Sequence, residues 1–355
     1  MRKICFIVNV DWFYLSHRSD LVKSLSKKFS IDVIAGDSGA FTPNIFKFKV
    51  SKRIPTFGGL LRLRSLIRNH DSKTLFVVVS PVMIIIFKIF FSNNRNIIYN
   101  FSGLGFIRKL SKLGKLIFLK IITSRFLNSN EYFVVQNSDD YKLFSNEQNF
   151  DQSKLCLIPG SGFHNLKTHN NNNNNNNNNL TIGFVGRISK DKGVLTLIKS
   201  VNNLICRGFK INLVIWGAID YEGSHNFSSD EISFLQQNKK YLNGVSKNKE
   251  LIFESFDVFC LPSNGEGLSK AAIEASSYHK PLLLSNVVGN RDMIDENGYL
   301  FEFGNVNDLS EKILILNSLS EFQFKKTGNK SKELFDEKWS FKRISNDWYN
   351  LLKNI

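Results

Sequence analysis

The sequence predicts an α/β protein made of two parallel-sheet domains. Short apolar runs alternate with helical segments along the chain, which is typical of parallel strands covered by helices on both faces. A length of 355 residues suits two domains of ordinary size, and 42% hydrophobic residues are enough for buried cores. We expect a first domain over residues 1–165, a linker over 166–180 and a second domain over 181–338.

The first half of the chain contains five predicted strands, with a helix between the first two. The N-terminal run Lys3–Val8 is too short for the apolar part of a signal peptide and predicts the first strand. A helix is expected next, over Ser19–Lys28. The other strands of this half are predicted at Ile31–Ala35, Thr74–Ser80, Asn96–Asn100 and Tyr132–Gln136.

The apolar run Leu75–Phe91 resembles a membrane span at first sight. It has 17 residues, is divided by Ser80 and Pro81, and is interrupted by Lys88. A spanning helix needs about 20 mostly apolar residues. Proline suits a first helical turn, so we predict a buried strand followed by a core helix that starts at Pro81.

A run of ten asparagines, Asn170–Asn179, separates the two halves. It cannot bury apolar surface, so it predicts a flexible linker. The C-terminal segment Ser340–Asn354 has apolar residues at helical spacing, and we expect residues 339–355 to return to the first domain as a helix. Strands of the second half are predicted at Thr181–Val185, Asn212–Trp216, Val258–Leu261 and Pro281–Ser285.

The net charge of +16 is concentrated in the first half. Residues 1–168 hold 25 Lys/Arg against 10 Asp/Glu, whereas residues 169–355 hold 22 against 21. This asymmetry predicts an anionic partner for the first domain: an anionic membrane, a phosphorylated lipid or nucleic acid. The alternative is a basic surface that only keeps the protein in solution.

A basic amphipathic helix is predicted over Phe106–Phe126. Cationic residues form one stripe of this helix, and apolar residues form another. Such a helix suits the surface of an anionic bilayer. The alternative is an ordinary helix whose apolar side covers its own sheet, and periodicity does not separate the two. The stripes are Arg108, Lys112 and Lys115, and Leu110, Leu113, Ile117 and Ile121.

The four cysteines lie in apolar runs without the spacing of metal ligands. We expect all four to be buried, reduced thiols in a cytosolic protein. They are Cys5, Cys156, Cys206 and Cys260.

A loop and a helix start follow the predicted strand Val258–Leu261. Ser269 is expected to cap a helix that runs from Lys270 to about Tyr278. The free N–H groups and the positive dipole end of such a helix suit a diphosphate. Gly265 and Gly267 in the preceding loop let the backbone approach a ligand closely.

Two glutamates flank this helix start. Glu266 lies in the loop and Glu274 lies about one and a half turns inside the helix. Carboxylates accept hydrogen bonds from hydroxyls, so Glu274 is suited to a ribose and Glu266 to a transferred sugar. The alternative for this spacing alone is two surface glutamates on an ordinary helix connection.

Two cations follow the predicted strand Thr181–Val185. Gly186 opens the turn, and Arg187 and Lys192 follow with four residues between them. Such cations can neutralise a β-phosphate as a leaving group gains charge. The alternative is a polar loop with a solvated arginine and lysine.

Together these motifs resemble family 4 glycosyltransferases, the retaining group with the GT-B fold of two Rossmann-like domains facing a cleft. The resemblance covers nearly the whole chain and includes landmarks of bacterial members that build O-antigen and other lipopolysaccharide, capsule or protein-linked glycans. Further matching segments are Asn9–Arg18, Ser102–Gly105, Gln136–Asp140, Ile158–Gly162, Gly289, Arg291 and Asn297–Gly298.

The resemblance implies a role for each matching residue. Glu266, Arg187 and Lys192 are implied as catalytic residues. The donor nucleotide sugar would contact Gly186, Arg187, Lys192, Glu266, Gly267, Leu268, Ser269 and Glu274. The acceptor would lie near Asp11, His17, Ser102, Gly103 and Gly105. His17 could equally have no role at the acceptor and simply be a residue at the end of a helix.

The implied activity is transfer of a hexose or N-acetylhexosamine from a nucleotide-diphosphate sugar, with a UDP-sugar favoured, to a lipid-linked glycan. The enzyme would work at the inner face of the cell membrane, as a cytoplasmic peripheral protein without a cofactor or bound metal. The absence of an Asp-x-Asp motif from the sequence agrees with this expectation.

Three other functions remain open from the sequence. A nucleotide-sugar epimerase or phosphorylase would use the same fold. A nucleic-acid binder would use the basic half, although no stacking motif is visible. A dinucleotide oxidoreductase would use Ser102–Gly105, but this segment lacks the third glycine and a following ribose acid.

Overall fold

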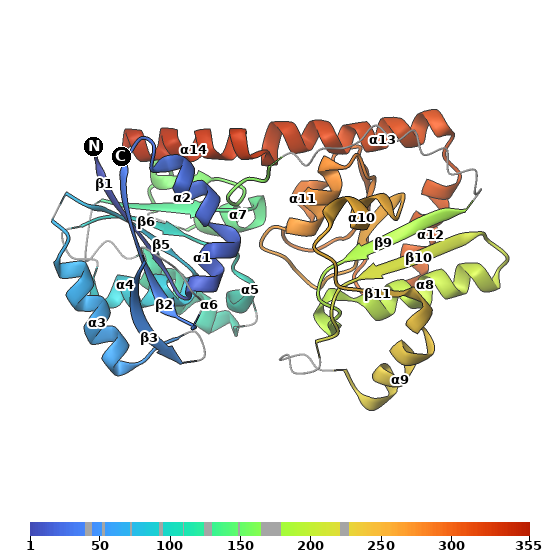
Figure 1. The fold of residues 1–355 in the computed structure, drawn as a ribbon, viewed down its shortest axis with the longest axis horizontal. Helices are drawn as coiled ribbons and strands as arrows, with labels where there is room; N and C mark the ends of the chain where they lie inside the picture. Colours follow the sequence, from blue (N-terminus) through green and yellow to red (C-terminus); the bar gives the residue numbers. More distant parts are fainter. Residues whose placement is uncertain are drawn as a thin grey trace. The chain divides into compact units, whose positions relative to one another are not determined.

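The protein divides into two compact units. The computed structural model describes residues 1–39, 45–51, 54–71, 73–91, 95–108, 110–123, 130–147, 150–164, 179–220 and 227–355. Unit 1 comprises Met1–Gly162 and Phe341–Ile355, and unit 2 comprises Phe163–Ser340 (Figure 1). The chain thus changes unit a few residues away from the expected boundaries, because the Phe163 N–H donates to the Trp339 carbonyl within unit 2. Most of the asparagine run lies outside the described residues.

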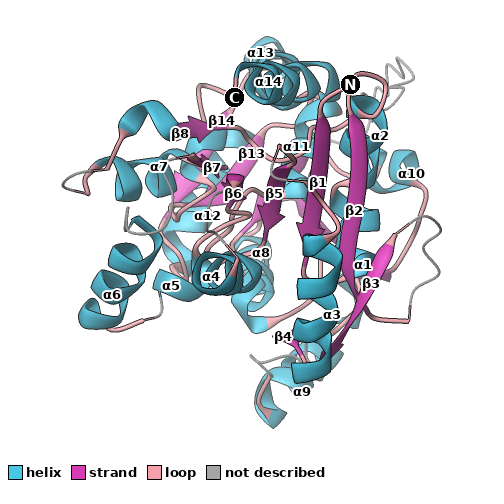
Figure 2. Cartoon of the chain, turned by 90° about the vertical axis from the view of Figure 1, so that its left-hand side faces the viewer, coloured by secondary structure: helices cyan, strands magenta, loops and turns pink. Residues whose placement is uncertain are grey.

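Unit 1 is built around an eight-stranded sheet of order β4-β3-β2-β1-β5-β6-β7-β8. All neighbouring strands are parallel except β3 and β4, and β1 and β2 run side by side in Figure 2. The central strands are rich in Val, Ile and Phe because both faces of the sheet are covered. The strands are β1 (Lys3–Val8), β2 (Ser30–Asp37), β3 (Phe46–Ser51), β4 (Ile54–Pro55), β5 (Leu75–Val79), β6 (Asn96–Asn100), β7 (Glu131–Val135) and β8 (Leu155–Leu157).

Helices cover this sheet on both faces and bury two separate apolar clusters. One face carries α1 (Asp11–His17), α2 (Ser19–Leu25) and α14 (Phe341–Asn354). The other carries α3 (Phe57–Arg68), α4 (Pro81–Phe90), α5 (Gly105–Arg108), α6 (Lys112–Thr123) and α7 (Ser138–Ser145). The predicted strand and core helix around Pro81 are confirmed, since Ser80 caps α4 and Pro81 occupies its first turn.

The C-terminal helix α14 packs in unit 1. Its residues Ile344, Trp348 and Leu352 are fully buried in the same cluster as α2. The Trp348 indole N–H donates to the Gly160 carbonyl at 3.3 Å, and the Arg2 guanidinium donates to the Leu352 carbonyl at 2.9 Å. Both ends of the chain are therefore fixed to unit 1.

The predicted continuous helix over Phe106–Phe126 is wrong. The structure has two helices, α5 and α6, and residues 124–126 lie outside the described part. Ser111 begins the second helix because its hydroxyl accepts from the Gly114 N–H at 3.1 Å, which competes with helix continuation. Arg108 therefore does not share a helical stripe with Lys112 and Lys115.

The cysteines are free of disulfides, but their burial differs from the prediction. Cys5 and Cys260 are buried, Cys156 is half-buried and Cys206 is exposed at the end of its helix. Burial raises the pKa of the Cys5 and Cys260 thiols, which keeps them protonated. Among the described residues, no helix has the length and apolar character needed to cross a bilayer.

Unit 2 contains a six-stranded parallel sheet of order β11-β10-β9-β12-β13-β14. It buries one large apolar cluster. The predicted strands of this half are confirmed to within one residue. The strands are β9 (Leu180–Val185), β10 (Ile211–Trp216), β11 (Leu242–Gly244), β12 (Val258–Leu261), β13 (Leu282–Ser285) and β14 (Gly298–Phe301). The helices are α8 (Val194–Cys206), α9 (Ser229–Gln237), α10 (Lys249–Glu254), α11 (Lys270–Ser277), α12 (Val306–Asn317) and α13 (Glu321–Leu334).

The strand order reverses direction between β9 and β12. After β9 the chain builds β10 and β11 on one side, then returns to place β12 on the other side. Because the strands are parallel, the loops that follow β9 and β12 leave the sheet at the same edge. Ligands of open parallel sheets bind at such a switch point. Both sequence motifs of this half lie there.

Candidate active site

The loop after β9 is held against the loop after β10. The Gly186 N–H donates to the Trp216 carbonyl at 2.9 Å, and a Cβ at Gly217 would lie 1.8 Å from the Gly186 carbonyl oxygen. The Arg187 side chain is exposed, and its Nη1 lies 2.6 Å from Asp220 Oδ2. The guanidinium is therefore oriented by a carboxylate from the neighbouring loop, which the sequence motif did not indicate.

The same loop contacts the loop after β12 through a glycine. Gly193 has φ 69°, and a Cβ there would lie 1.9 Å from the Pro262 carbonyl oxygen. Two residues earlier, the Asp191 carbonyl accepts from the Asn264 N–H at 2.8 Å. Only glycine allows this approach, so the two motifs are fixed against one another by their backbones.

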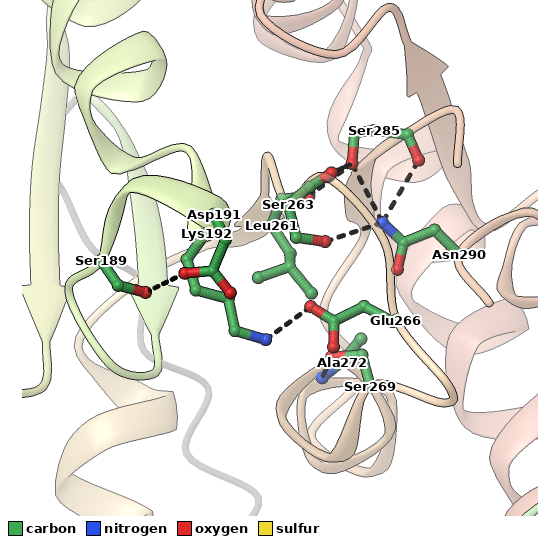
Figure 3. A network of polar contacts seen from close by, with 10 residues as sticks. All are labelled: Ser189, Asp191, Lys192, Leu261, Ser263, Glu266, Ser269, Ala272, Ser285 and Asn290. Carbon is green, nitrogen blue, oxygen red and sulfur yellow. Dashed lines mark hydrogen bonds and ion pairs between the residues drawn. The ribbon is translucent and has the colours of Figure 1, made fainter. Parts of the chain in front are cut away.

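These contacts bring a lysine and a glutamate together. Lys192 lies in the short 3-10 helix η2 (Lys190–Lys192), and its Nζ is 2.6 Å from Glu266 Oε1 (Figure 3). Their side chains are 22% and 12% exposed. The pair is thus partly shielded from water, yet both groups remain open to a ligand.

Asp191 orders the backbone beside this pair. Its carboxylate accepts from the Ser189 hydroxyl at 2.6 Å, as Figure 3 shows. Burial alone would raise the pKa of Asp191, but the Ser189 hydrogen bond and the charges of Lys192 and Arg187 outweigh it, so the pKa lies below its ordinary value. The carboxylate is therefore ionised, and its negative charge stabilises the nearby cations Lys192 and Arg187.

The N-terminus of α11 forms one side of this group. Ser269 caps the helix by accepting from the Ala272 N–H at 3.3 Å, which confirms the predicted cap and helix start. The first N–H groups of a helix lack partners within the helix and carry a partial positive charge. The Glu266 N–H donates to the Val288 carbonyl at 3.0 Å, so the loop before the cap is anchored as well.

A buried polar cluster supports the loop from behind. Ser263, Ser285 and Asn290 are fully buried, and the Asn290 amide N–H donates to the Ser285 hydroxyl at 3.1 Å (Figure 3). The Ser285 hydroxyl in turn donates to the Ser263 carbonyl. Sequence reasoning missed this cluster, because Ser263 follows β12 whereas Ser285 ends β13 and Asn290 lies just after it, and no sequence motif links the two segments.

Glu274 lies deeper in α11 and pairs with a residue that the sequence did not single out. Its Oε2 is 2.9 Å from Lys249 Nζ at the start of α10. The glutamate is buried, with 8% of its surface exposed. Glu266 and Glu274 are thus each paired with a lysine.

The remaining residues predicted for the donor lie at the same edge. Gly267 and Leu268 complete the loop between Glu266 and the Ser269 cap. Leu268 is half-buried and packs against the core of unit 2. The structure therefore brings all the donor-side residues into unit 2, around the ends of β9 and β12.

The residues predicted for the acceptor side lie in unit 1. Asp11 is fully buried at the start of α1, where its Oδ2 lies 3.0 Å from Lys47 Nζ and its Oδ1 accepts from the Trp12 N–H at 2.8 Å. Ser102 and Gly103 follow β6, and Gly105 begins α5.

His17 occupies the last position of α1, six residues after Asp11. At about 1.5 Å rise per residue, the two lie at opposite ends of the helix. The imidazole stacks on Phe13, with ring centroids 4.6 Å apart, and its Nδ1 lies 2.6 Å from the Ser16 hydroxyl. These local contacts agree with a residue that ends a helix.

The donor-side arrangement is suited to an anion that carries hydroxyl groups. Cations at Arg187 and Lys192 and a helix N-terminus provide positive charge. Glu266 and Glu274 provide acceptors on either side. Among the described residues, no group of three His, Cys, Asp or Glu side chains could hold a metal ion.

The sequence and the fold are similar to those of known proteins. Residues 166–332 match the family described as glycosyl transferases group 1. The chain is 28% identical over 197 residues to the capsular polysaccharide biosynthesis glycosyltransferase CapM of Staphylococcus aureus, which covers 55% of this chain and 48% of CapM. This chain therefore matches about half the length of that relative.

A second relative aligns over nearly the whole chain. It is the N,N'-diacetylbacillosaminyl-diphospho-undecaprenol alpha-1,3-N-acetylgalactosaminyltransferase of Campylobacter jejuni, 23% identical over 361 residues, with 99% of this chain and 83% of that protein covered. Among solved structures, Anabaena Alr3699/HepE in complex with UDP and glucose gives a TM-score of 0.75 at 15% identity, with 100% of both chains covered. At this identity the likeness shows the fold, which is GT-B.

Proposed function

We propose that this protein, whose residues 166–332 match the group 1 glycosyl transferases, transfers a hexose or N-acetylhexosamine from a UDP-sugar to a lipid-linked glycan with retention of anomeric configuration. The observation that carries the proposal is the contact between Lys192 and Glu266 beside the N-terminus of α11. This contact brings the Lys192 ammonium and the Glu266 carboxylate together beside the positive end of the α11 dipole. The complex of Anabaena Alr3699/HepE with UDP and glucose supports the choice of donor.

The reaction exchanges one C–O bond for another at the anomeric carbon. The bond from the anomeric carbon to the diphosphate breaks, and a bond to the acceptor hydroxyl oxygen forms on the same face. The hydroxyl proton passes to the departing phosphate oxygen, and the nucleoside diphosphate is released. Negative charge therefore grows on the β-phosphate during the step.

Each donor-side group has a distinct task in this step. Lys192, Arg187 and the first N–H groups of α11 stabilise the charge that develops on the phosphate. Glu266 accepts hydrogen bonds from the transferred sugar and stabilises positive charge at the anomeric carbon. Glu274 accepts hydrogen bonds from the ribose. No bound metal or cofactor is assigned to any of these tasks.

A transfer assay with defined donors tests the proposal. Purified protein is first screened with UDP-, GDP- and dTDP-sugars for thermal stabilisation, which selects the donor. Sugar transfer to an undecaprenyl-diphosphate-linked glycan is then followed, and NMR of the product gives its anomeric configuration. A product of inverted configuration contradicts the mechanism. Release of an epimer or free sugar without acceptor favours the epimerase or phosphorylase alternative.

The acceptor and the membrane surface form a second part of the proposal. Helix α6 buries Phe118, Leu119 and Ile122 in the core of unit 1 but leaves Leu113 65% and Ile117 49% exposed. The apolar stripe predicted from the sequence is thus not used to cover the sheet. Exposed lysines of the same helix and the positive charge of residues 1–168 complement an anionic bilayer.

Vesicle flotation tests this surface. Wild-type protein should float with vesicles that contain phosphatidylglycerol and stay behind with pure phosphatidylcholine. The double substitution Leu113→Glu and Ile117→Glu should abolish flotation. Phe322→Glu is the matched control, because Phe322 is 77% exposed on α13 of unit 2. Equal failure of wild-type protein with both vesicles contradicts the membrane proposal and leaves the transfer reaction untouched.

A further inference from the structure

Lys249 occupies an unfavourable position for a cation. It is the first residue of α10, which Asn248 caps by accepting from the Leu251 N–H at 3.1 Å. The dipole of a helix favours cations at the opposite end. The ion pair of Lys249 Nζ with Glu274 Oε2 at 2.9 Å offsets this disadvantage. The presence of a lysine at position 249 is therefore explained by its contact with Glu274 and not by its place in the helix.

A pair of aromatic rings fixes α10 against α11. Phe253 follows Lys249 by one turn, and Tyr278 follows Glu274 by one turn. The two rings are buried and stacked, with centroids 5.0 Å apart and an interplanar angle of 18°. Lys249 Nζ lies 5.9 Å from the Phe253 ring centroid, so the ammonium lies over the same stack. The ion pair is thus the polar end of a rigid contact between two helices.

Glu274 has one occupied and one available oxygen. Oε2 pairs with Lys249, whereas Oε1 has no hydrogen-bond partner in the part of the chain that the structure describes. The glutamate is more than nine-tenths buried, so neighbouring atoms restrict its rotation. A carboxylate held through one oxygen presents the other oxygen in one direction.

We propose that Lys249 is a positioning residue that orients Glu274 to recognise the ribose hydroxyls of the donor nucleotide. The inference rests on the proposed function, in which Glu274 accepts hydrogen bonds from the ribose. Lys249 itself does not touch the nucleotide. It holds Oε2, and it compensates the charge of a carboxylate that is largely removed from water.

Nucleotide selectivity tests this role. Calorimetry measures the affinity for UDP and for 2′,3′-dideoxy-UDP, which lacks both ribose hydroxyls. If wild-type protein binds GDP more tightly than UDP, the experiment uses GDP and 2′,3′-dideoxy-GDP instead. Hydrogen bonds to a charged acceptor predict a wild-type preference of about tenfold or more for the ribonucleotide. Lys249→Met keeps the stem over Phe253 but removes the charge, and the preference should fall to about threefold or less. Lys249→Arg should restore it.

Lys240→Met is the matched control for these variants. Lys240 Nζ lies 4.9 Å from the Tyr241 ring centroid, so it is also a lysine over an aromatic ring, but the ion pair of Glu274 is with Lys249. It should keep the wild-type preference. If Lys249→Met weakens both nucleotides equally or lowers only the melting temperature, Lys249 is merely structural and the inference is wrong.

Glu274→Ala separates this inference from the proposed function. If Glu274→Ala loses the preference while Lys249→Met keeps it, only the positioning role fails. If Glu274→Ala retains the wild-type preference, the ribose role of Glu274 is wrong, and the inference falls with it. Absence of binding by both ribonucleotides overturns the donor site as a whole.

Discussion

Lys192 and Glu266 meet at 2.6 Å across two loops that leave the sheet at the ends of β9 and β12. In the proposed reaction, a donor diphosphate that approaches the lysine must share it with, or take it from, the glutamate. The exchange would give the partly buried Lys192 a new charge partner in place of the glutamate, so the ammonium would not be left unpaired. The pair thereby keeps both groups oriented before the donor arrives, as preorganised electrostatic stabilisation requires.

Replacement of Lys192 should slow transfer more than it weakens donor binding. In Lys192→Met, kcat should fall about 10²–10³-fold, because the leaving phosphate gains its charge in the transition state. KM should change only a few-fold. Lys190→Met is the matched control, since Lys190 is exposed and pairs with Glu231 at 2.9 Å outside the site. Steady-state kinetics of both variants decide the matter, and an unchanged kcat in Lys192→Met removes the assigned role.

Gly193 should tolerate no side chain. Alanine at a left-handed position costs about 1–2 kcal/mol. At Gly193 the added Cβ would also lie 1.9 Å from the Pro262 carbonyl oxygen, so the two site loops must separate. Gly193→Ala should therefore lower the free energy of unfolding well beyond that strain and weaken donor binding.

Gly208→Ala provides the control for this prediction. Gly208 has φ 87°, and a Cβ there would meet no atom within 4 Å. It should lose only the strain of the left-handed conformation, about 1–2 kcal/mol, with donor affinity unchanged. Denaturant unfolding and calorimetry of the two variants make the comparison. If both variants lose the same unfolding free energy, the contact between position 193 and the Pro262 carbonyl does not add to the cost of the alanine.

The sequence predicted the elements that bury apolar side chains in short runs. Strands such as Lys3–Val8 and Val258–Leu261 match the structure in both bounds, because a parallel strand covered on both faces is apolar throughout. The helix start at Ser269 was predictable for a local reason, since its hydroxyl bonds three residues along. Local chemistry also explains the error at Ser111, where a capping serine interrupts an apparently continuous amphipathic pattern.

Contacts between distant segments were beyond prediction from one sequence. Lys249 and Glu274 are 25 residues apart, and Arg187 and Asp220 are 33 apart. The first pair depends on how helices α10 and α11 pack, and the second on how the loops after β9 and β10 meet, which no spacing encodes. The motif residues follow from the sequence, but their charged partners Asp220 and Lys249 became visible only in the fold.

Removal of the lysine from the buried ion pair of unit 1 should lower the free energy of unfolding far more than removal of a lysine from a surface pair. Lys88 is 1% exposed and pairs with Glu131, whose other oxygen accepts from the Tyr99 hydroxyl at 3.0 Å. Burial raises the pKa of Glu131 despite the opposing effects of Lys88 and Tyr99. Lys88→Met leaves a buried carboxylate without its cation and should cost about 3–5 kcal/mol of unfolding free energy.

A double substitution tests the cause of that loss. Lys88→Met with Glu131→Leu removes both charges and should recover most of the stability, because well-packed apolar residues replace buried ion pairs with little cost. Lys325→Met, which breaks the exposed pair with Glu321, is the control and should leave the free energy of unfolding almost unchanged. Urea unfolding measures all three. If the double variant is as unstable as Lys88→Met, the loss of unfolding free energy comes from altered packing and not from the unpaired charge.

Asp11 should make the stability of unit 1 depend on pH in acid. Burial tends to raise the pKa of Asp11, but hydrogen bonds from Ser38 and Lys47, the charge of Lys47 and the Trp12 N–H outweigh it, so the pKa lies below the ordinary value of 3.8. A carboxyl group whose folded pKa is lowered contributes stability that is complete above its unfolded pKa. The contribution is lost as the pH falls through the folded pKa.

Asp11→Asn measures this contribution directly. The free energy of unfolding should be lower in the variant than in wild-type protein by a constant amount above about pH 5, where the unfolded carboxyl is ionised. The difference should shrink steadily below about pH 4 as wild-type Asp11 takes up its proton. Asp20→Asn, which removes an exposed carboxylate from the neighbouring helix α2, controls for the change in net charge. Urea unfolding between pH 3 and 7 gives the curves, and a difference that stays constant throughout this range would show that the Lys47 and Ser38 contacts do not lower the pKa of Asp11.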